Sequence, residues 1–148
     1  MKAHMIAALA LVLMASPASA ADTKACSTPE AEAAERGVDA LHSWSDLHAA
    51  FKKFGHCDDG AIAEGYSDFV MRMLASRWDE LGALQTAATA DPAFRAFVLS
   101  HIDETWVGVE FEKVMQSART HCPARARGLC LDILKSGSKT ASDTDHTQ

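Results

Sequence analysis

The sequence predicts an all-α protein, folded as a compact helical bundle that disulfides hold together. From about residue 28 onward, apolar residues recur at the three- and four-residue spacing of amphipathic helices. No stretch alternates in the way typical of strands, and β-branched residues are few. All four cysteines lie downstream of a secretory signal, which favours disulfide bonds. We therefore expect a single disulfide-linked helical domain.

Residues 1–20 have the pattern of a secretory signal peptide. Lys2 gives a positive start, residues 5–14 are apolar, and Ala18-Ser19-Ala20 fits an A-x-A cleavage site. Removing 20 of the 148 residues leaves 128, the length of one domain, which we place at residues 21–135. The loss of Lys2 changes the net charge from -6 to -7. No lipoprotein pattern precedes Cys26, so we expect a soluble product in the periplasm.

Two classes of partner are excluded by composition. An acidic chain lacks the basic stripe that binding to a phosphate backbone requires. No second apolar run approaches the roughly 18 residues of a membrane span.

The cysteines Cys26, Cys57, Cys122 and Cys130 are expected to form two disulfides, because their number is even and the chain is exported. Three pairings are possible, and we favour Cys26–Cys57 and Cys122–Cys130 because each closes a local loop. The second pair requires the helix to break between its cysteines, since eight residues of continuous helix would hold the sulfurs about 12 Å apart. Pro123 and Gly128 supply that break. A zinc site is disfavoured, because no C-x-x-C spacing exists.

Two short helices are predicted first. Thr28-Pro29-Glu30 opens one of them, with Thr28 as its N-cap and Pro29 at its first position, and Gly37 is its expected end. The other runs from about Ser45 to Phe54 and stops at Gly55. It places the side chains of Leu47, Phe51 and Phe54 on one side.

The third helix has the clearest pattern. Asp58 or Asp59 caps it, and it is expected to run to about Leu81. Its apolar arc, which we interpret as core, consists of Ile62, Tyr66, Phe69, Val70, Met73, Leu74 and, at the edge, Trp78. The opposite face carries charged residues, Glu64, Asp68, Arg72 and Asp79, of which Asp68 and Arg72 form an (i, i+4) pair. Small residues flank the arc and would let another backbone approach closely, namely Ala61, Gly65 and Ser76.

The remaining elements follow from local signals. The helical pattern fades over residues 82–90, where we expect a loop that protrudes around Leu84, Gln85 and Thr86. Asp91 and Pro92 then open a helix that points inward the side chains of Phe94, Phe97, Val98 and His101. A long helix over residues 105–121 buries Val107, Phe111, Val114, Met115 and Ala118. Pro123 ends it, a short helix covers residues 127–135, and the polar residues 136–148 are predicted to be a disordered tail.

Few residues are candidates for a catalytic or metal-binding role. Glu64 and Asp68 lie one turn apart, and paired carboxylates can serve as the acid and base of a glycosidase, but these two share a polar face with Arg72 and should both be ionised. The run His56-Cys57-Asp58-Asp59-Gly60 lacks the alternating oxygen ligands of a calcium loop, and helix capping explains its acids. No two histidines have the spacing that holds a metal on a helix face. We therefore predict no catalytic residues, no cofactor and no metal.

Two polar residues on apolar faces have structural interpretations. We expect His101 to be a core histidine with satisfied hydrogen bonds. Arg77 projects toward the apolar arc of the third helix, so it must extend to solvent, pair with a carboxylate or meet a partner protein. Pairing within the molecule is the favoured interpretation.

A resemblance to a known family adds to these predictions. It is carried by the string Cys57-Asp58-Asp59-Gly60-Ala61-Ile62-Ala63-Glu64-Gly65-Tyr66-Ser67-Asp68 and by Trp78 ten residues later. Asp-Pro-Ala-Phe-Arg at 91–95 and Cys122-Pro123 with Cys130 extend it to residues 26–135. The chain resembles the periplasmic immunity proteins that neutralise type VI secretion amidase effectors. The resemblance implies an all-helical, often disulfide-bonded homodimer that binds a peptidoglycan amidase and blocks its Cys–His active-site cleft. The tail after Lys135 and the glycine at Gly108 depart from the family pattern.

The sequence therefore predicts a protein that inhibits and does not catalyse. We expect the end of the third helix and the following loop to contact the effector, through Glu64, Asp68, Asp79, Leu84, Gln85 and Thr86. The negative charge would steer a basic hydrolase toward this surface. Two alternatives remain open: an inhibitor of another periplasmic or host hydrolase such as a lysozyme, and a small exported hydrolase that uses Glu64 and Asp68.

Overall fold

The computed structural model describes residues 24–102 and 109–143, and this part of the chain is all-α, as predicted. Its helices are α1 (Thr28–Val38), α2 (Trp44–Phe54), α3 (Gly60–Ser76), α4 (Leu81–Ala90), α5 (Pro92–Ser100), α6 (Val109–Thr120) and α7 (Arg127–Asp143). Three short 3₁₀ turns connect them, η1 (Gly55–Cys57), η2 (Trp78–Glu80) and η3 (Ala124–Ala126). The predicted signal peptide, Val107 and Gly108 lie outside the described residues.

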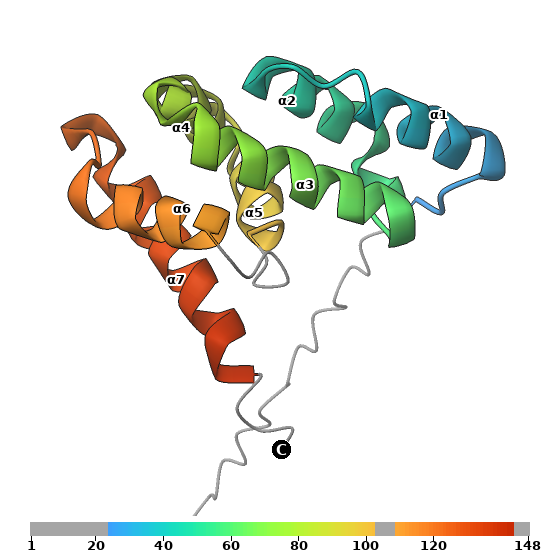
Figure 1. The fold of residues 1–148 in the computed structure, drawn as a ribbon. Helices are drawn as coiled ribbons and strands as arrows, with labels where there is room; N and C mark the ends of the chain where they lie inside the picture. Colours follow the sequence, from blue (N-terminus) through green and yellow to red (C-terminus); the bar gives the residue numbers. More distant parts are fainter. Residues whose placement is uncertain (1–23, 103–108, 144–148) are drawn as a thin grey trace, which may run out of the picture.

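Helix α3 lies at the centre of the fold (Figure 1). It packs against α1 on one side and α6 on the other, while α4 packs against α2 and α5, and α7 packs against α5 and α6. The predicted apolar arc of α3 is buried, with Tyr66 and Val70 completely inaccessible, and Trp78 is half-buried just beyond the helix. The arc therefore forms the core on which the outer helices pack.

Local sequence signals start most of these helices. Asp91 caps α5 as predicted, because its carboxylate accepts hydrogen bonds from the backbone N–H groups of Ala93 and Phe94, both at 3.1 Å. The cap of α1 is Ser27 and not the predicted Thr28. The Glu30 carboxylate accepts from both the hydroxyl and the backbone N–H of Ser27, at 2.6 and 3.1 Å, and this side-chain interaction draws the helix start back by one residue.

Three predicted boundaries are wrong. Helix α3 ends at Ser76 and not near Leu81, because Arg77 leaves the helical conformation with φ -130° and ψ 47°. Residues 81–90 form helix α4 and not a loop. Helix α7 continues to Asp143, so residues 136–143 are helical where a disordered tail was predicted. Its first turns bury Leu129 and Ile133, and adding residues to an established helix is easier than starting one.

Both predicted disulfides are present, and no described cysteine is free. Cys26–Cys57 ties the segment before α1 to η1, with the Cα atoms 4.9 Å apart. Cys122–Cys130 joins the end of α6 to α7, with the Cα atoms 6.2 Å apart, because the helix breaks between them at η3 as expected. Such bonds indicate an oxidising, extracellular-type environment.

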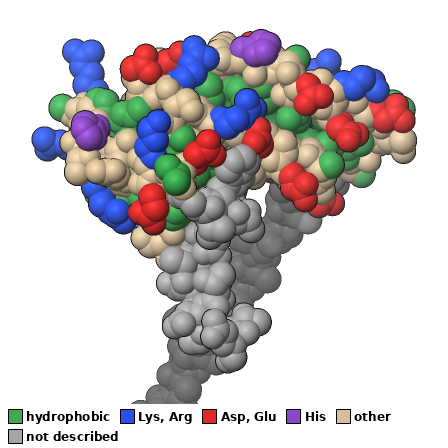
Figure 2. All heavy atoms as spheres, viewed as in Figure 1, with side chains coloured by type: hydrophobic (Ala, Val, Ile, Leu, Met, Phe, Trp, Pro, Cys, Tyr) green, Lys and Arg blue, Asp and Glu red, His purple; other side chains and the backbone are tan. Residues whose placement is uncertain are grey.

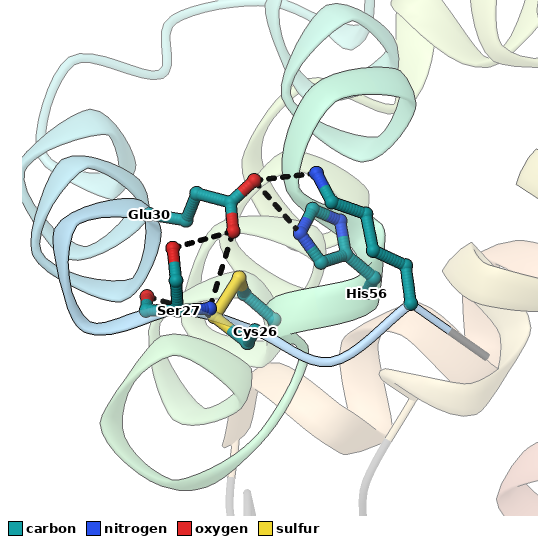
Figure 3. The surroundings of a disulfide bond; sticks show 6 residues. Cys26, Ser27, Glu30 and His56 are labelled. Carbon is teal, nitrogen blue, oxygen red and sulfur yellow. Dashed lines mark hydrogen bonds and ion pairs between the residues drawn. A yellow bond between two sulfur atoms is a disulfide. The ribbon is translucent and has the colours of Figure 1, made fainter.

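A polar cluster surrounds the first disulfide (Figure 3). The Glu30 carboxylate lies between Ser27 and His56, whose Nε2 is 3.3 Å from it, and also pairs with Lys24. The hydrogen bond from Lys24, followed by those from Ser27, lowers the pKa of Glu30 to about 2. The disulfide and this cluster together fix the start of α1 against η1.

No helix among residues 24–102 and 109–143 is long and apolar enough to cross a membrane.

Candidate partner-binding surface

The exposed face of α3 carries the charged residues that the sequence predicted there. Glu64 is exposed, and one turn later the half-buried Asp68 accepts a hydrogen bond from Arg72 Nε at 2.6 Å. The opposite side of the same helix is core, so packing fixes the orientation of this face. The structure therefore brings Glu64 and Asp68 together on one rigid element.

The other predicted contact residues are placed differently. Asp79 is exposed, but it lies in η2, beyond the break at Arg77, and does not extend the α3 face. Leu84 is completely buried in α4 and cannot touch a partner. Thr86 is exposed and donates a hydrogen bond to the Gly82 carbonyl at 2.9 Å. The predicted protruding loop is thus wrong.

Gln85 is held within α4. It is half-buried, and its amide donates a hydrogen bond to the Thr89 hydroxyl at 2.7 Å. Residues 81–90 are helical because Leu81, Leu84 and Ala88 form an apolar stripe that is buried against α2 and α5.

A shallow hollow of about 250 Å³ lies beside the charged face of α3. It is lined by Leu41, His42, Phe69, Arg72, Met73, Ser76 and Arg77. The Arg77 guanidinium donates to the His42 carbonyl at 2.9 Å and pairs with Glu80. The expectation that Arg77 pairs within the molecule is confirmed, and its contact with His42 ties the α1–α2 connection to the end of α3.

A cluster of Ser67 and Asp58 around the buried His101 was not predicted as a unit. The Ser67 hydroxyl lies 2.9 Å from His101 Nδ1, and the Asp58 carboxylate lies 3.2 Å from His101 Nε2. His101 is only 4% exposed, which confirms it as a core histidine with satisfied hydrogen bonds. The residue types are those of a nucleophilic triad, so the cluster has to be tested against a catalytic interpretation.

Burial of His101 is consistent with a structural role for this cluster. A nucleophile and its base must face a cleft that admits substrate. Ser67, His101 and Asp58 line neither the hollow beside α3 nor the two hollows on α7, one against α5 and one at its junction with α6. The cluster instead joins the end of α5 to the start and middle of α3. Burial, and then the Asp58 charge, raise the pKa of Tyr66 beside it.

Among the described residues, no three His, Cys, Asp or Glu side chains gather in a way that could hold a metal ion.

The described residues define a disulfide-linked all-α protein that exposes one charged face of its central helix. Comparisons with models of protein families, with curated proteins and with solved structures find no match for this chain.

Proposed function

We propose that this protein is a periplasmic immunity protein, a non-catalytic inhibitor that binds and blocks a peptidoglycan amidase effector of type VI secretion. The observation that carries the proposal is the exposed, charged face of α3, with Glu64, Asp68 and Arg72, on a helix whose other side is core. The sequence resemblance supports it, because the string 57–68 that carries it includes the start of this same helix.

Rigidity favours such a function. A surface that is already ordered loses little conformational entropy on binding, so more of the contact energy becomes affinity. Packing of α3 between α1 and α6 supplies that order, and two disulfides restrain the ends of the domain. The same disulfides suit the oxidising periplasm.

Charge supports the choice of partner. The chain has a formal net charge of -6, which would speed association with a basic hydrolase and make the rate fall as salt rises. We place the contact on Glu64 and Asp68, with the hollow that Leu41 and Phe69 help to line beside them. A homodimer, as the resemblance implies, would present this face twice.

The test is inhibition of a purified type VI amidase, measured as muropeptide release from peptidoglycan. Asp68→Lys and Glu64→Lys should each weaken binding by tenfold or more, whereas Glu32→Lys on the exposed side of α1 should not. Unchanged binding by both α3 variants would place the surface elsewhere. Light scattering of the purified protein measures the proposed dimer.

The same assay separates the alternatives. Inhibition of a lysozyme but of no amidase would assign a different hydrolase as the partner. Release of muropeptides by the protein alone, lost in Glu64→Ala, would overturn the inhibitor proposal and support a hydrolase.

A further inference from the structure

The arginines of this protein fall into two groups. Four of them pair with carboxylates: Arg36 with Glu32, Arg72 with Asp68, Arg77 with Glu80 and Arg95 with Asp132. The remaining three, Arg119, Arg125 and Arg127, are exposed, and no carboxylate of the described residues pairs with them.

These three arginines lie together where α6 joins α7. Residues 117–131 contain all three and no carboxylate, although the whole chain has a net charge of -6. In Figure 2, blue side chains with some red ones among them lie at this end of the molecule, and red ones predominate over the opposite end. Like charges at this density repel one another. Arg119, in the last turn of α6, is favoured by the helix dipole, but the dipole does not explain Arg125 and Arg127.

A hollow with both apolar and polar lining lies between Arg119 and Arg127. It has a volume of about 450 Å³, within the range of roughly 300–1,000 Å³ typical of ligand pockets. Its lining includes Arg119, Arg127, the Cys122–Cys130 disulfide, Leu131 and Leu134. Leu131 is 58% exposed, one of two large apolar residues of the described chain that are so open.

The hollow is rigid. The disulfide closes the connection between α6 and α7, and the Trp78 indole donates a hydrogen bond to the His121 carbonyl at 3.0 Å. The arginines therefore project from a fixed frame, which reduces the entropy that a partner's binding would remove.

We propose that this α6–α7 surface, formed by Arg119, Arg125, Arg127, Leu131 and Leu134, binds an acidic segment of a partner protein. An apolar side chain of that segment enters the hollow, and flanking carboxylates pair with the arginines, which can bind them bidentately. The surface is separate from the α3 face and does not depend on the proposed inhibitory function.

Two other occupants fit less well. A second copy docked across a two-fold axis would bring the arginines of both copies together, and like-charge juxtaposition opposes such a contact. A membrane surface would favour a protruding apolar face, whereas this one is concave and its apolar lining lies between arginines.

The probe is a fluorescent helical peptide with leucines at positions i, i+3, i+4 and i+7 and glutamates elsewhere. Matched peptides replace the glutamates by glutamine or the leucines by serine. Anisotropy should show saturable binding of the first peptide only, weakening as salt is raised from 50 to 300 mM.

Variants locate the binding. Arg119→Glu with Arg127→Glu should weaken it at least tenfold, and Leu131→Ser several-fold, with the fold checked by circular dichroism. Arg36→Glu, an exposed arginine of α1, is the control and should bind like the parent. No saturable binding, or equal affinity in all variants, would overturn the proposal. So would binding to phosphatidylglycerol vesicles without binding to the peptide.

Discussion

Helices α1 and α3 approach so closely that a methyl group on Gly65 should destabilise the fold. A Cβ atom built at Gly65 would lie 2.5 Å from Val38 Cγ1 and 3.3 Å from Val38 Cβ. Replacing glycine by alanine inside a helix normally stabilises it by about 0.5–1 kcal/mol. Overpacking a contact of this kind costs about 1–3 kcal/mol, and the stiff valine side chain offers little relief. We therefore expect Gly65→Ala to lower the free energy of unfolding by about 1–2 kcal/mol.

The assay is urea unfolding followed by circular dichroism, with two controls. Gly82→Ala is the matched control, because nothing lies within 4 Å of its Cβ position, and it should leave stability equal or raise it by up to about 1 kcal/mol. Val38→Ala in the Gly65→Ala background should restore part of the loss, with a favourable coupling energy of about 1 kcal/mol. If Gly65→Ala stabilises the protein as Gly82→Ala does, the close contact of α1 with α3 is refuted.

Three further predictions concern α4, the start of α5 and the disulfides. Leu84→Ala should lower the free energy of unfolding by about 2–5 kcal/mol, whereas Thr86→Ala at an exposed position should change it by less than about 0.5 kcal/mol. If Leu84→Ala has as small an effect as Thr86→Ala, residue 84 is not in the core. Hydrogen bonds from His48 and then from the Phe94 N–H lower the pKa of Asp91 from 3.8 to about 2, so its ionised form stabilises the fold above pH 4 and that stabilisation is lost as the pH falls toward 2. The free energy of unfolding of the parent should therefore approach that of Asp91→Asn as the pH is lowered from about 4 to about 2. A difference that stays constant with pH would contradict the hydrogen bonds to the Asp91 carboxylate. Replacing both cysteines of Cys26–Cys57, 31 residues apart, by serine should lower the free energy of unfolding by about 3.7 kcal/mol, against about 2.5 kcal/mol for Cys122–Cys130, 8 residues apart. The reverse order in denaturant melts would contradict loop closure as the cause.

Features that depend on neighbouring residues were predictable from the sequence. The cap at Asp91, the apolar arc around Tyr66 and the disulfide Cys122–Cys130 all arise from local spacing, and the structure confirms each of them. Gly65 belongs with them, because a small residue beside an apolar arc allows the close approach that Val38 makes.

Features that depend on tertiary contacts were not predictable. Residues 81–90 have no side-chain cap and no charged face to mark a helix, although Ala and Leu favour one, and Leu84 is buried against the rest of the core. No proline or glycine marks the end of α3, where Arg77 instead reaches the His42 carbonyl, 35 residues away in sequence.

The candidate sites divide in the same way. The charged face of α3 could be predicted from the sequence, because Glu64 and Asp68 are one helical turn apart. The contact of His101 with Asp58 joins residues 43 apart, and no local pattern announces it. Arg119 and Arg127 can be read directly from the sequence. That no carboxylate within residues 24–102 and 109–143 pairs with them is a property of the folded surface.

The separation of charge along the molecule has a practical consequence in purification. A chain with a net charge of -6 is expected to bind an anion-exchange resin. The unpaired arginines at the α6–α7 end should also retain it on a cation exchanger at low salt, with that end facing the resin. The anion exchanger would therefore hold the acidic end and leave the α6–α7 end facing solution, and the cation exchanger would do the reverse. Immobilised on a negatively charged support, the protein would keep its α1 end open to solution.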